Sequence, residues 1–309
     1  MHQRPIEPLE PRQLLSIALV NGRLEVKATD AADVVSIDND EFPSRIRVVV
    51  NATIRRFDTV AVTAGVIMSG LDGNDSMTVA PSFNASIPVS LYGFAGNDTL
   101  TGGAGPDAIF GGENPDTISG QGGQDTLRGE EGPDLINGNG ANDVLYGHDD
   151  NDELVGSAGN DKLYGGIDDD TLVGQAGRDT LKGEDGEDQL EGDEDPDNLD
   201  GGGGNDTLVG GSGSDRLFGG DDNDSLRGNG GNDTVDGGLD DDIINADSGA
   251  DSITAGDGAD VIRSNDGEAD VVSAGAGNDF LKVDRTLDTF DGGGGNDTYF
   301  DEDGDVFFP

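Results

Sequence analysis

The sequence predicts an all-β fold, in which a solenoid of stacked parallel strands follows an irregular β-rich N-terminal cap. Three observations carry this prediction. From Asp98 to Asp260 an aspartate recurs every nine residues, an aliphatic residue stands two positions after each aspartate, and a glycine-rich turn precedes it. Aromatic residues make up only 5% of the chain, and 53 of its 309 residues are glycine. Such a composition, combined with a strict period, indicates a repeat architecture rather than an ordinary globular core.

The net charge restricts the partners of the chain. With 65 acidic against 17 basic residues the formal charge is −48, which repels nucleic acid and requires a bound cation in any compact fold. Soft and borderline metals lack ligands, because the chain has no cysteine and two histidines. Carboxylates and main-chain carbonyls are hard oxygen donors that suit calcium. No stretch approaches the roughly 18 apolar residues of a membrane span.

Residues 1–16 are interpreted as an export or sorting segment. Arg4 and Arg12 precede a short apolar run at 14–20, as in a signal peptide, but Asn21-Gly22 favours a hairpin between strands at 16–20 and 23–28. Residues 9–16, Leu-Glu-Pro-Arg-Gln-Leu-Leu-Ser, resemble the LEPR-x-LL element near the N-terminus of many surface or exported proteins of planctomycetes and related bacteria. That resemblance implies an export context.

Residues 17–92 are predicted to form the N-terminal cap. Further strands are expected at 33–37, 45–54 and 59–68, and residues 70–78 are one isolated copy of the repeat before a longer coil at 81–92. The arginines at 45, 47, 55 and 56 could contact an acidic partner. We favour a charge-balancing strand pair that closes the end of the array, because stacked repeats need a differently built end.

The regular array covers residues 93–263. Numbered from the glycine, position six is the aspartate, position eight is Leu, Ile or Val, and position four is Gly, Asn or Asp except at Ala141. Those residue types predict a left-handed backbone at position four. Positions one to six are expected to form a turn, and positions seven to nine a three-residue strand. Two units of nine then make one coil, so that Leu100 lies under Ile118 and the aspartates form two files.

Aspartates stacked in files repel one another unless a cation lies between them. The two files, of ten and nine aspartates, have 17 gaps, and one calcium ion in each would leave a net charge of about −14. The predicted metal ligands are Asp98, Asp107, Asp116, Asp125, Asp134, Asp143, Asp152, Asp161, Asp170, Asp179, Asp188, Asp197, Asp206, Asp215, Asp224, Asp233, Asp242, Asp251 and Asp260.

The nonapeptide G-G-x-G-x-D-x-U-x resembles the hemolysin-type calcium-binding repeat of RTX proteins. The resemblance implies a parallel β-roll, the RTX nonapeptide solenoid, in which the position-six aspartate and carbonyls of positions one to four bind calcium. Departures are alanine at position one (Ala246, Ala255) and one extra residue in 264–273. Residues 264–309 are interpreted as degenerate repeats with a C-terminal cap or export signal, and calcium binding beyond Asp260 is left open.

The resulting functional hypothesis is a secreted or surface calcium-binding structural module, folded by calcium and located outside the cell. The alternative is a calcium-dependent adhesin that binds a polysaccharide or protein, with ice binding and an RTX enzyme as distant alternatives. The chain has no His-Glu-x-x-His or Gly-x-Ser-x-Gly motif, and His148 is interpreted as a solvent-facing residue without a second histidine. No enzyme activity is expected.

Overall fold

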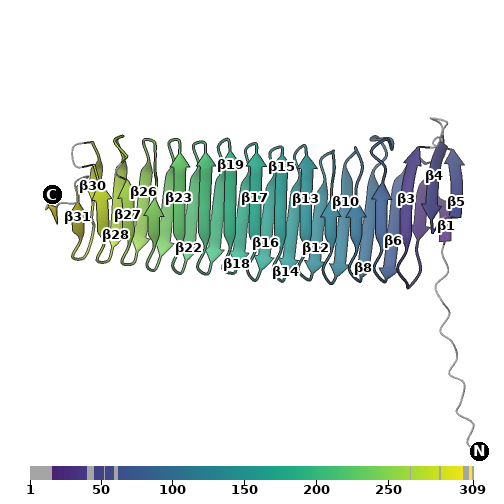
Figure 1. Ribbon diagram of the computed structural model, residues 1–309, viewed down its shortest axis with the longest axis horizontal. Coiled ribbons are helices and arrows are strands. Elements are labelled where there is room, and N and C mark those ends of the chain that lie inside the picture. Colours follow the sequence, from purple (N-terminus) through teal and green to yellow (C-terminus); the bar gives the residue numbers. More distant parts are fainter. Residues whose placement is uncertain are drawn as a thin grey trace, which may run out of the picture.

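A computed structural model shows an elongated β-solenoid, with β1 at one end and β31 at the other (Figure 1). It describes residues 16–39, 45–51, 53–58, 62–264, 266–284, 287–301 and 306–307. These residues form strands and turns without a helix, which confirms the predicted all-β class, and among them no helix is long and apolar enough to cross a membrane. Residues 1–15 of the export-like segment predicted at 1–16 lie outside the described residues, and Ser16 begins the first strand.

The strands form two sheets on opposite sides of the rod. In spatial order, the first sheet contains β1 (Ser16–Val20), β2 (Arg23–Lys27), β6 (Gly65–Asp72), β8 (Val89–Ala95), β10 (Asp107–Glu113), β12 (Thr126–Glu131), β14 (Val144–Asp149), β16 (Lys162–Ile167), β18 (Thr180–Asp185), β20 (Asn198–Gly203), β22 (Arg216–Asp221), β24 (Thr234–Leu239), β26 (Ser252–Asp257), β28 (Val271–Ala276) and β30 (Thr289–Asp291). The second sheet contains β5 (Thr53–Asp58), β4 (Arg45–Val50), β3 (Val34–Asn39), β7 (Ser76–Val79), β9 (Thr99–Thr101), β11 (Thr117–Ser119), β13 (Leu135–Gly140), β15 (Glu153–Ala158), β17 (Thr171–Ala176), β19 (Gln189–Glu194), β21 (Thr207–Ser212), β23 (Ser225–Gly230), β25 (Ile243–Asn245), β27 (Val261–Ser264), β29 (Phe280–Val283), β31 (Thr298–Phe300) and β32 (Val306–Phe307).

The 18-residue coil predicted from the sequence is confirmed by the strand register. Within the array, successive strands of each sheet run parallel, and Leu100 pairs with Ile118 in the second sheet as Ile109 pairs with Leu127 in the first. The position-eight side chains of both sheets are at most 2% exposed and belong to one continuous core. Each coil therefore contributes two aliphatic side chains, one from each sheet.

The predicted strand length of three residues is confirmed for β9, β11 and β25 and is too short for most other strands of the array. From β12 to β24 every strand has six residues instead of three. Hydrogen-bonded pairing continues past the position-one glycine into the next unit, as where Glu130 pairs with His148. The continuation also occurs where position one is alanine, since β26 runs through Ala255 and pairs at Gly256 and Asp257.

The N-terminal cap contains antiparallel strands that the array lacks. The hairpin of β1 and β2 is confirmed, with positive φ at Asn21 (50°) and Gly22 (80°). The predicted single strand at 45–54 was wrong, because Asn51, with a φ of 47°, reverses the chain and produces the antiparallel pair β4 and β5. The strand expected from 59 begins at Gly65, and residues 59–61 lie outside the described residues.

The arginine-rich strands close one end of the second sheet, in agreement with the favoured interpretation. Arg47 Nε donates to Asp38 Oδ1 at 2.9 Å, across the β3–β4 pair. The side chain of Arg55 is outside the described residues. Asp75, in the segment 70–78, and Asp98 are 23 residues apart and hydrogen-bonded, and the extra segment between them places Phe83 and Ile87 in the core.

Candidate metal centre

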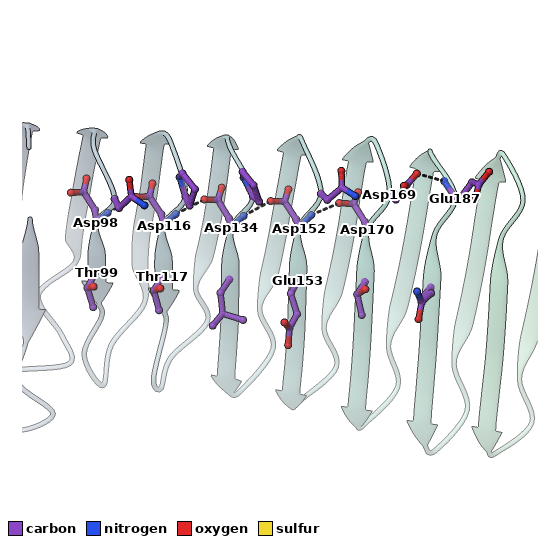
Figure 2. A pocket seen from close by; sticks show the side chains of 17 residues that line it. Asp98, Thr99, Asp116, Thr117, Asp134, Asp152, Glu153, Asp169, Asp170 and Glu187 are labelled. Carbon is purple, nitrogen blue, oxygen red and sulfur yellow. Dashed lines mark hydrogen bonds between the residues drawn. The ribbon is translucent and has the colours of Figure 1, made fainter. Parts of the chain in front are cut away.

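The two files of aspartates lie where each turn enters a strand. All nineteen predicted aspartates are buried, with exposed fractions of 5% or less. Figure 2 shows Asp98, Asp116, Asp134, Asp152 and Asp170 in one row along the edge of the second sheet. The structure therefore brings the predicted residues together as two files, with neighbours 18 residues apart.

Main-chain hydrogen bonds lock each aspartate to the next coil. The amide of Asp152 donates to Oδ1 of Asp170 at 2.8 Å, and the amide of Asp170 donates to Oδ1 of Asp188 at 2.7 Å. The carbonyl of Asp152 accepts from the amide of Thr171 at 2.9 Å. Consequently the amide, the carbonyl and one carboxylate oxygen of each aspartate are already used by the fold.

The second carboxylate oxygen, Oδ2, is the polar atom of each aspartate that these hydrogen bonds do not use. In eighteen of the nineteen aspartates it is buried and has no hydrogen-bond partner. The exception is Asp107, whose Oδ2 accepts from the amide of Gly103 at 2.6 Å. Leaving a buried carboxylate oxygen without a partner costs free energy, and a repeated cost of this kind points to a ligand.

The position-one glycine leaves the space into which Oδ2 points. A Cβ atom on Gly165 would lie 2.3 Å from Oδ2 of Asp170 and 2.8 Å from the carbonyl oxygen of Gly183. The same arrangement repeats at Gly93 and Gly147. A carboxylate oxygen and a main-chain carbonyl of the next coil thus border one small space, which any larger residue would fill.

Burial makes the negative form of these aspartates unfavourable. It raises the pKa of Asp98 to about 6. It raises the pKa of Asp152 to about 8, and repulsion from Asp134 and Asp170 adds to that rise. The aspartates therefore hold their charge at neutral pH only against a cost, and a bound cation would remove this cost.

The donor set fits calcium. In the part of the chain that the structure describes, no three His, Cys, Asp or Glu side chains form a metal-binding cluster. Carboxylate oxygens from the files must therefore be completed by main-chain carbonyls. The position-four carbonyls are candidates, since they stack from coil to coil, as shown by a Cβ on Gly177 that would lie 1.6 Å from the carbonyl oxygen of Gly159. Oxygen donors of these two kinds match the preference of calcium for six to eight hard ligands.

The turn contains two left-handed positions, of which only one was predicted. Position four has positive φ at most units, including Asn114 (79°) and Ala141 (85°). Position two also has positive φ, with 80° at Phe94, 84° at Glu130 and 89° at His148. The varied residue types at position two concealed this requirement, although other units carry glycine there.

Position five supplies a ladder that the sequence analysis missed. The amide of Asn160 donates to Oδ1 of Asn142 at 3.0 Å, and the amide of Arg178 donates to Oδ1 of Asn160 at 2.9 Å. Pro115 and Pro133 interrupt this ladder because proline has no amide hydrogen. The available signal was the frequent Asn immediately before the aspartate.

The files extend beyond the nineteen predicted residues. Upstream, the amide of Asp75 donates to Oδ1 of Asp98 at 2.7 Å. Downstream, Asp251 and Asp260 donate in the same way to Asp270 and Asp279, at 2.8 and 3.0 Å. Oδ2 of Asp75, Asp270 and Asp279 is likewise buried without a partner. The extra residue in 264–273 therefore leaves both files continuous.

Two further expectations concern single residues. Alanine at position one does not by itself shorten a strand: β25 ends at Asn245 before Ala246, but β26 runs through Ala255 to Asp257. β9 and β11 also end before position one, where Gly102 and Gly120 stand. His148 is half-buried and stacks on Tyr146 with ring centroids 5.7 Å apart, so the solvent-facing assignment was wrong.

Comparison with known protein families gives one family. A family model that describes four copies of the RTX calcium-binding nonapeptide repeat matches ten overlapping segments, from residues 92–127 to residues 265–299. The matches cover residues 92–299 without a gap, which includes all nineteen predicted aspartates but not Asp75. A comparison with curated proteins gave no match.

Proposed function

This chain belongs to the family of RTX calcium-binding nonapeptide repeats, and from that premise we propose that its β-roll is a structural module whose folding is driven by calcium. The observation that supports this function best is the unpartnered, buried Oδ2 atom repeated along both files. Calcium would supply the missing positive partner for each of these oxygens. Its binding free energy would then become folding free energy.

The nineteen aspartates from Asp98 to Asp260 are the proposed ligands, and up to about 17 ions would fill the gaps between them. Oδ1 of each aspartate orders the preceding coil, whereas Oδ2 and nearby carbonyls would face the ion. Because each coil positions the aspartate of its neighbour, binding in one gap would order the next gap. We therefore propose cooperative filling along the rod.

The proposed location is outside the cell or on its surface. Extracellular calcium modules typically have Kd values of about 10⁻⁴–10⁻³ M, far above free calcium in a cytosol. With such affinity the array would remain unfolded until it reached a calcium-rich compartment. An export system is therefore a proposed partner, and we assign no catalytic role to the chain.

A calcium titration followed by far-UV circular dichroism tests this function. We expect β-structure to appear cooperatively with millimolar calcium and to disappear when a chelator is added. Magnesium at the same concentration serves as the control, since it prefers a rigid octahedral shell with several waters. Equal β-structure in chelator and in calcium would refute a calcium-driven fold.

Ice binding is not favoured by the outward face of the second sheet. Thr99 and Thr117 are exposed at position seven, and Glu153 lies further along the same row (Figure 2). The strand register places Leu135 between Thr117 and Glu153. A regular row of threonines is therefore absent from this part of the sheet. The threonines are explained by their preference for exposed strands.

A further inference from the structure

A column of aromatic and cationic side chains runs along the outer face of the first sheet. Tyr92 stacks on Phe110 with centroids 4.8 Å apart and planes 1° apart, and Tyr146 stacks on Tyr164 at 5.0 Å. Arg128 bridges the two pairs, with its guanidinium carbon 5.9 Å from the Phe110 ring centre and 4.7 Å from that of Tyr146. In an array with few aromatic residues, this column occupies one continuous stretch of five strands.

The N-terminal end of this column opens into a hollow of about 450 Å³. Its apolar wall consists of Tyr92, Phe94 and Phe110, from β8 and β10. Phe94 is 48% exposed, and its ring is tilted 32° from that of Tyr92, with centroids 6.1 Å apart. Unlike the flat pair of Tyr92 and Phe110, Phe94 therefore keeps much of its ring accessible.

Phe94 places an exposed aromatic ring at position two, where its φ is 80°. Gly112 holds the equivalent place in the next coil of the same sheet, and polar side chains such as Glu130 occupy it in others. An exposed apolar ring at this position is not explained by packing in the core, which is a reason to seek a binding role.

Carboxylates surround the apolar wall. Asp72, Glu113, Glu130 and Glu131 line the hollow. Within the described residues none of the four forms an ion pair. Arg128, on the same strand as Glu130, lies over the rings of Phe110 and Tyr146. Aromatic rings and unpaired carboxylates together attract an organic cation, because the ring face and the carboxylates are both negative.

We propose that this aromatic–acidic hollow is a docking site for a basic peptide segment of a protein partner. A lysine or arginine side chain would place its alkyl stem against Phe94 and its charge between the ring and the glutamates. The hollow crosses β6, β8, β10 and β12, about 14 Å at the usual strand spacing, which suits about four residues of extended chain. A flat sugar ring fits less well, since Tyr92 and Phe110 cover one face of each other.

Binding of a labelled peptide to the calcium-loaded full chain tests the proposal. The probe is an acetylated, amidated peptide with alternating lysine and alanine, followed by fluorescence polarisation in about 0.15 M salt, which screens distant charges beyond roughly 8 Å. We expect F94G to weaken binding about two- to fivefold, since glycine suits the backbone there but removes the ring. The double variant E130Q/E131Q should weaken it about three- to tenfold.

Matched controls separate this site from the general attraction of an acidic chain. F218A removes another exposed ring of the first sheet, and E194Q/E268Q removes two exposed charges elsewhere. Both should bind the peptide within twofold of the unaltered chain, and calcium-dependent circular dichroism should be unchanged in all four variants. The proposal is overturned if the hollow variants bind like these controls, if a glutamine-for-lysine peptide binds equally well, or if only neutral oligosaccharides respond to F94G. None of these outcomes bears on whether calcium folds the array.

Discussion

The N-terminal cap and the regular array bury polar groups in different ways. In the described part of the cap that precedes the isolated repeat at 70–78, protein groups serve as partners: Arg47 pairs with Asp38, and Oδ2 of Asp33 accepts from the amide of Thr29 at 2.6 Å. In the array, every aspartate of the two files from Asp98 to Asp260 except Asp107 has one buried oxygen without a hydrogen-bond partner. The cap thus satisfies these buried polar groups with its own donors, whereas the array leaves a row of buried carboxylate oxygens for a cation, as the proposed function requires.

The cap also buries a larger share of apolar side chains than the array does. Within the cap, β2 and β4 each bury alternate side chains, such as Leu24 and Val26 or Ile46 and Val48. The array buries one aliphatic residue in each nine, together with one acid. Apolar burial is the main favourable term in folding, so the array has less of it per residue to set against charge repulsion.

Removing calcium should give the largest effect. Hydrogen exchange followed by mass spectrometry in a chelator at pH 7.5 should show fast exchange for amides of residues 99–263. Amides of β2 and β4 should remain protected, because their partners are protein groups. Loss of protection in the cap at the same rate would show that cap and array are one cooperative unit.

Acid should partly replace calcium. Burial raises the pKa of Asp116 and Asp143 to about 8 and that of Asp98 to about 6, all from 3.8. Without calcium the fold therefore favours the protonated acids, so its stability is complete below about pH 4 and is lost as pH rises through 6 to 8.

Circular dichroism in chelator at pH 5 and pH 8 measures this effect, and the β-signal should be larger at pH 5. With calcium present the dependence reverses, since ligand carboxylates must be deprotonated, and the calcium midpoint should increase as pH falls. An apo signal that does not change between the two pH values would contradict the cost assigned to the buried charges.

Replacing a single buried acid should have a smaller effect. D170N keeps an Oδ1 acceptor for the amide of Asp152 but replaces Oδ2 with a nitrogen that cannot bind calcium. We expect the loss of one or two bound ions and a calcium midpoint raised on the order of tenfold, measured by calorimetric titration. In chelator the variant should be more stable than the unaltered chain, because a buried charge is gone.

The neighbouring residue provides the control. Asp169 is exposed at position five, and its Oδ1 accepts from the amide of Glu187 at 3.0 Å. D169N keeps that acceptor and removes the same charge, and it should retain the ion number. Equal losses in the two variants would mean that overall charge, not the file of Oδ2 atoms, determines binding.

Adding a methyl group should give the smallest effect. In G165A the new Cβ would lie 2.3 Å from Oδ2 of Asp170, and we expect about 1–3 kcal/mol of destabilisation in thermal unfolding with calcium. Gly203, at position three, has no atom within 4 Å of its Cβ position, and G203A should stabilise by about 0.4–1 kcal/mol. Because Ala246 and Ala255 already occupy position one, G165A should still fold. Equal effects of the two substitutions would show that the space beside Oδ2 is not needed.

The repeat period made most of the array predictable. Leu100 and Ile118 are 18 residues apart and lie in register, since a strict period allows only one way to stack coils that share a core. The two files of aspartates followed from the same register. Position four could be inferred because Gly, Asn and Asp share a tolerance of positive φ.

The strand lengths, the turn at Asn51 and the separate roles of Oδ1 and Oδ2 depend on backbone and side-chain geometry that cannot be inferred from residue types. The six-residue strands pass through the position-one glycine. Because glycine is normally depleted in strands, the sequence analysis placed the start of the turn at this glycine, two residues before the strand ends. At Asn51 the turn within 45–54 has no glycine beside it. The roles of Oδ1 and Oδ2 could not be separated from sequence, since both belong to one carboxylate.

The coil that carries 19 residues between Asp251 and Asp270 has a consequence for how this rod can change during evolution. Its strand still pairs Ser252 with Val271, so the surplus residue is absorbed outside the pairing. Single insertions in a turn therefore alter only the outline of the rod. Duplication or deletion of 18 residues would change its reach by roughly 4.8 Å without any new core. Selection can thus change the length of this molecule in steps of one 18-residue coil.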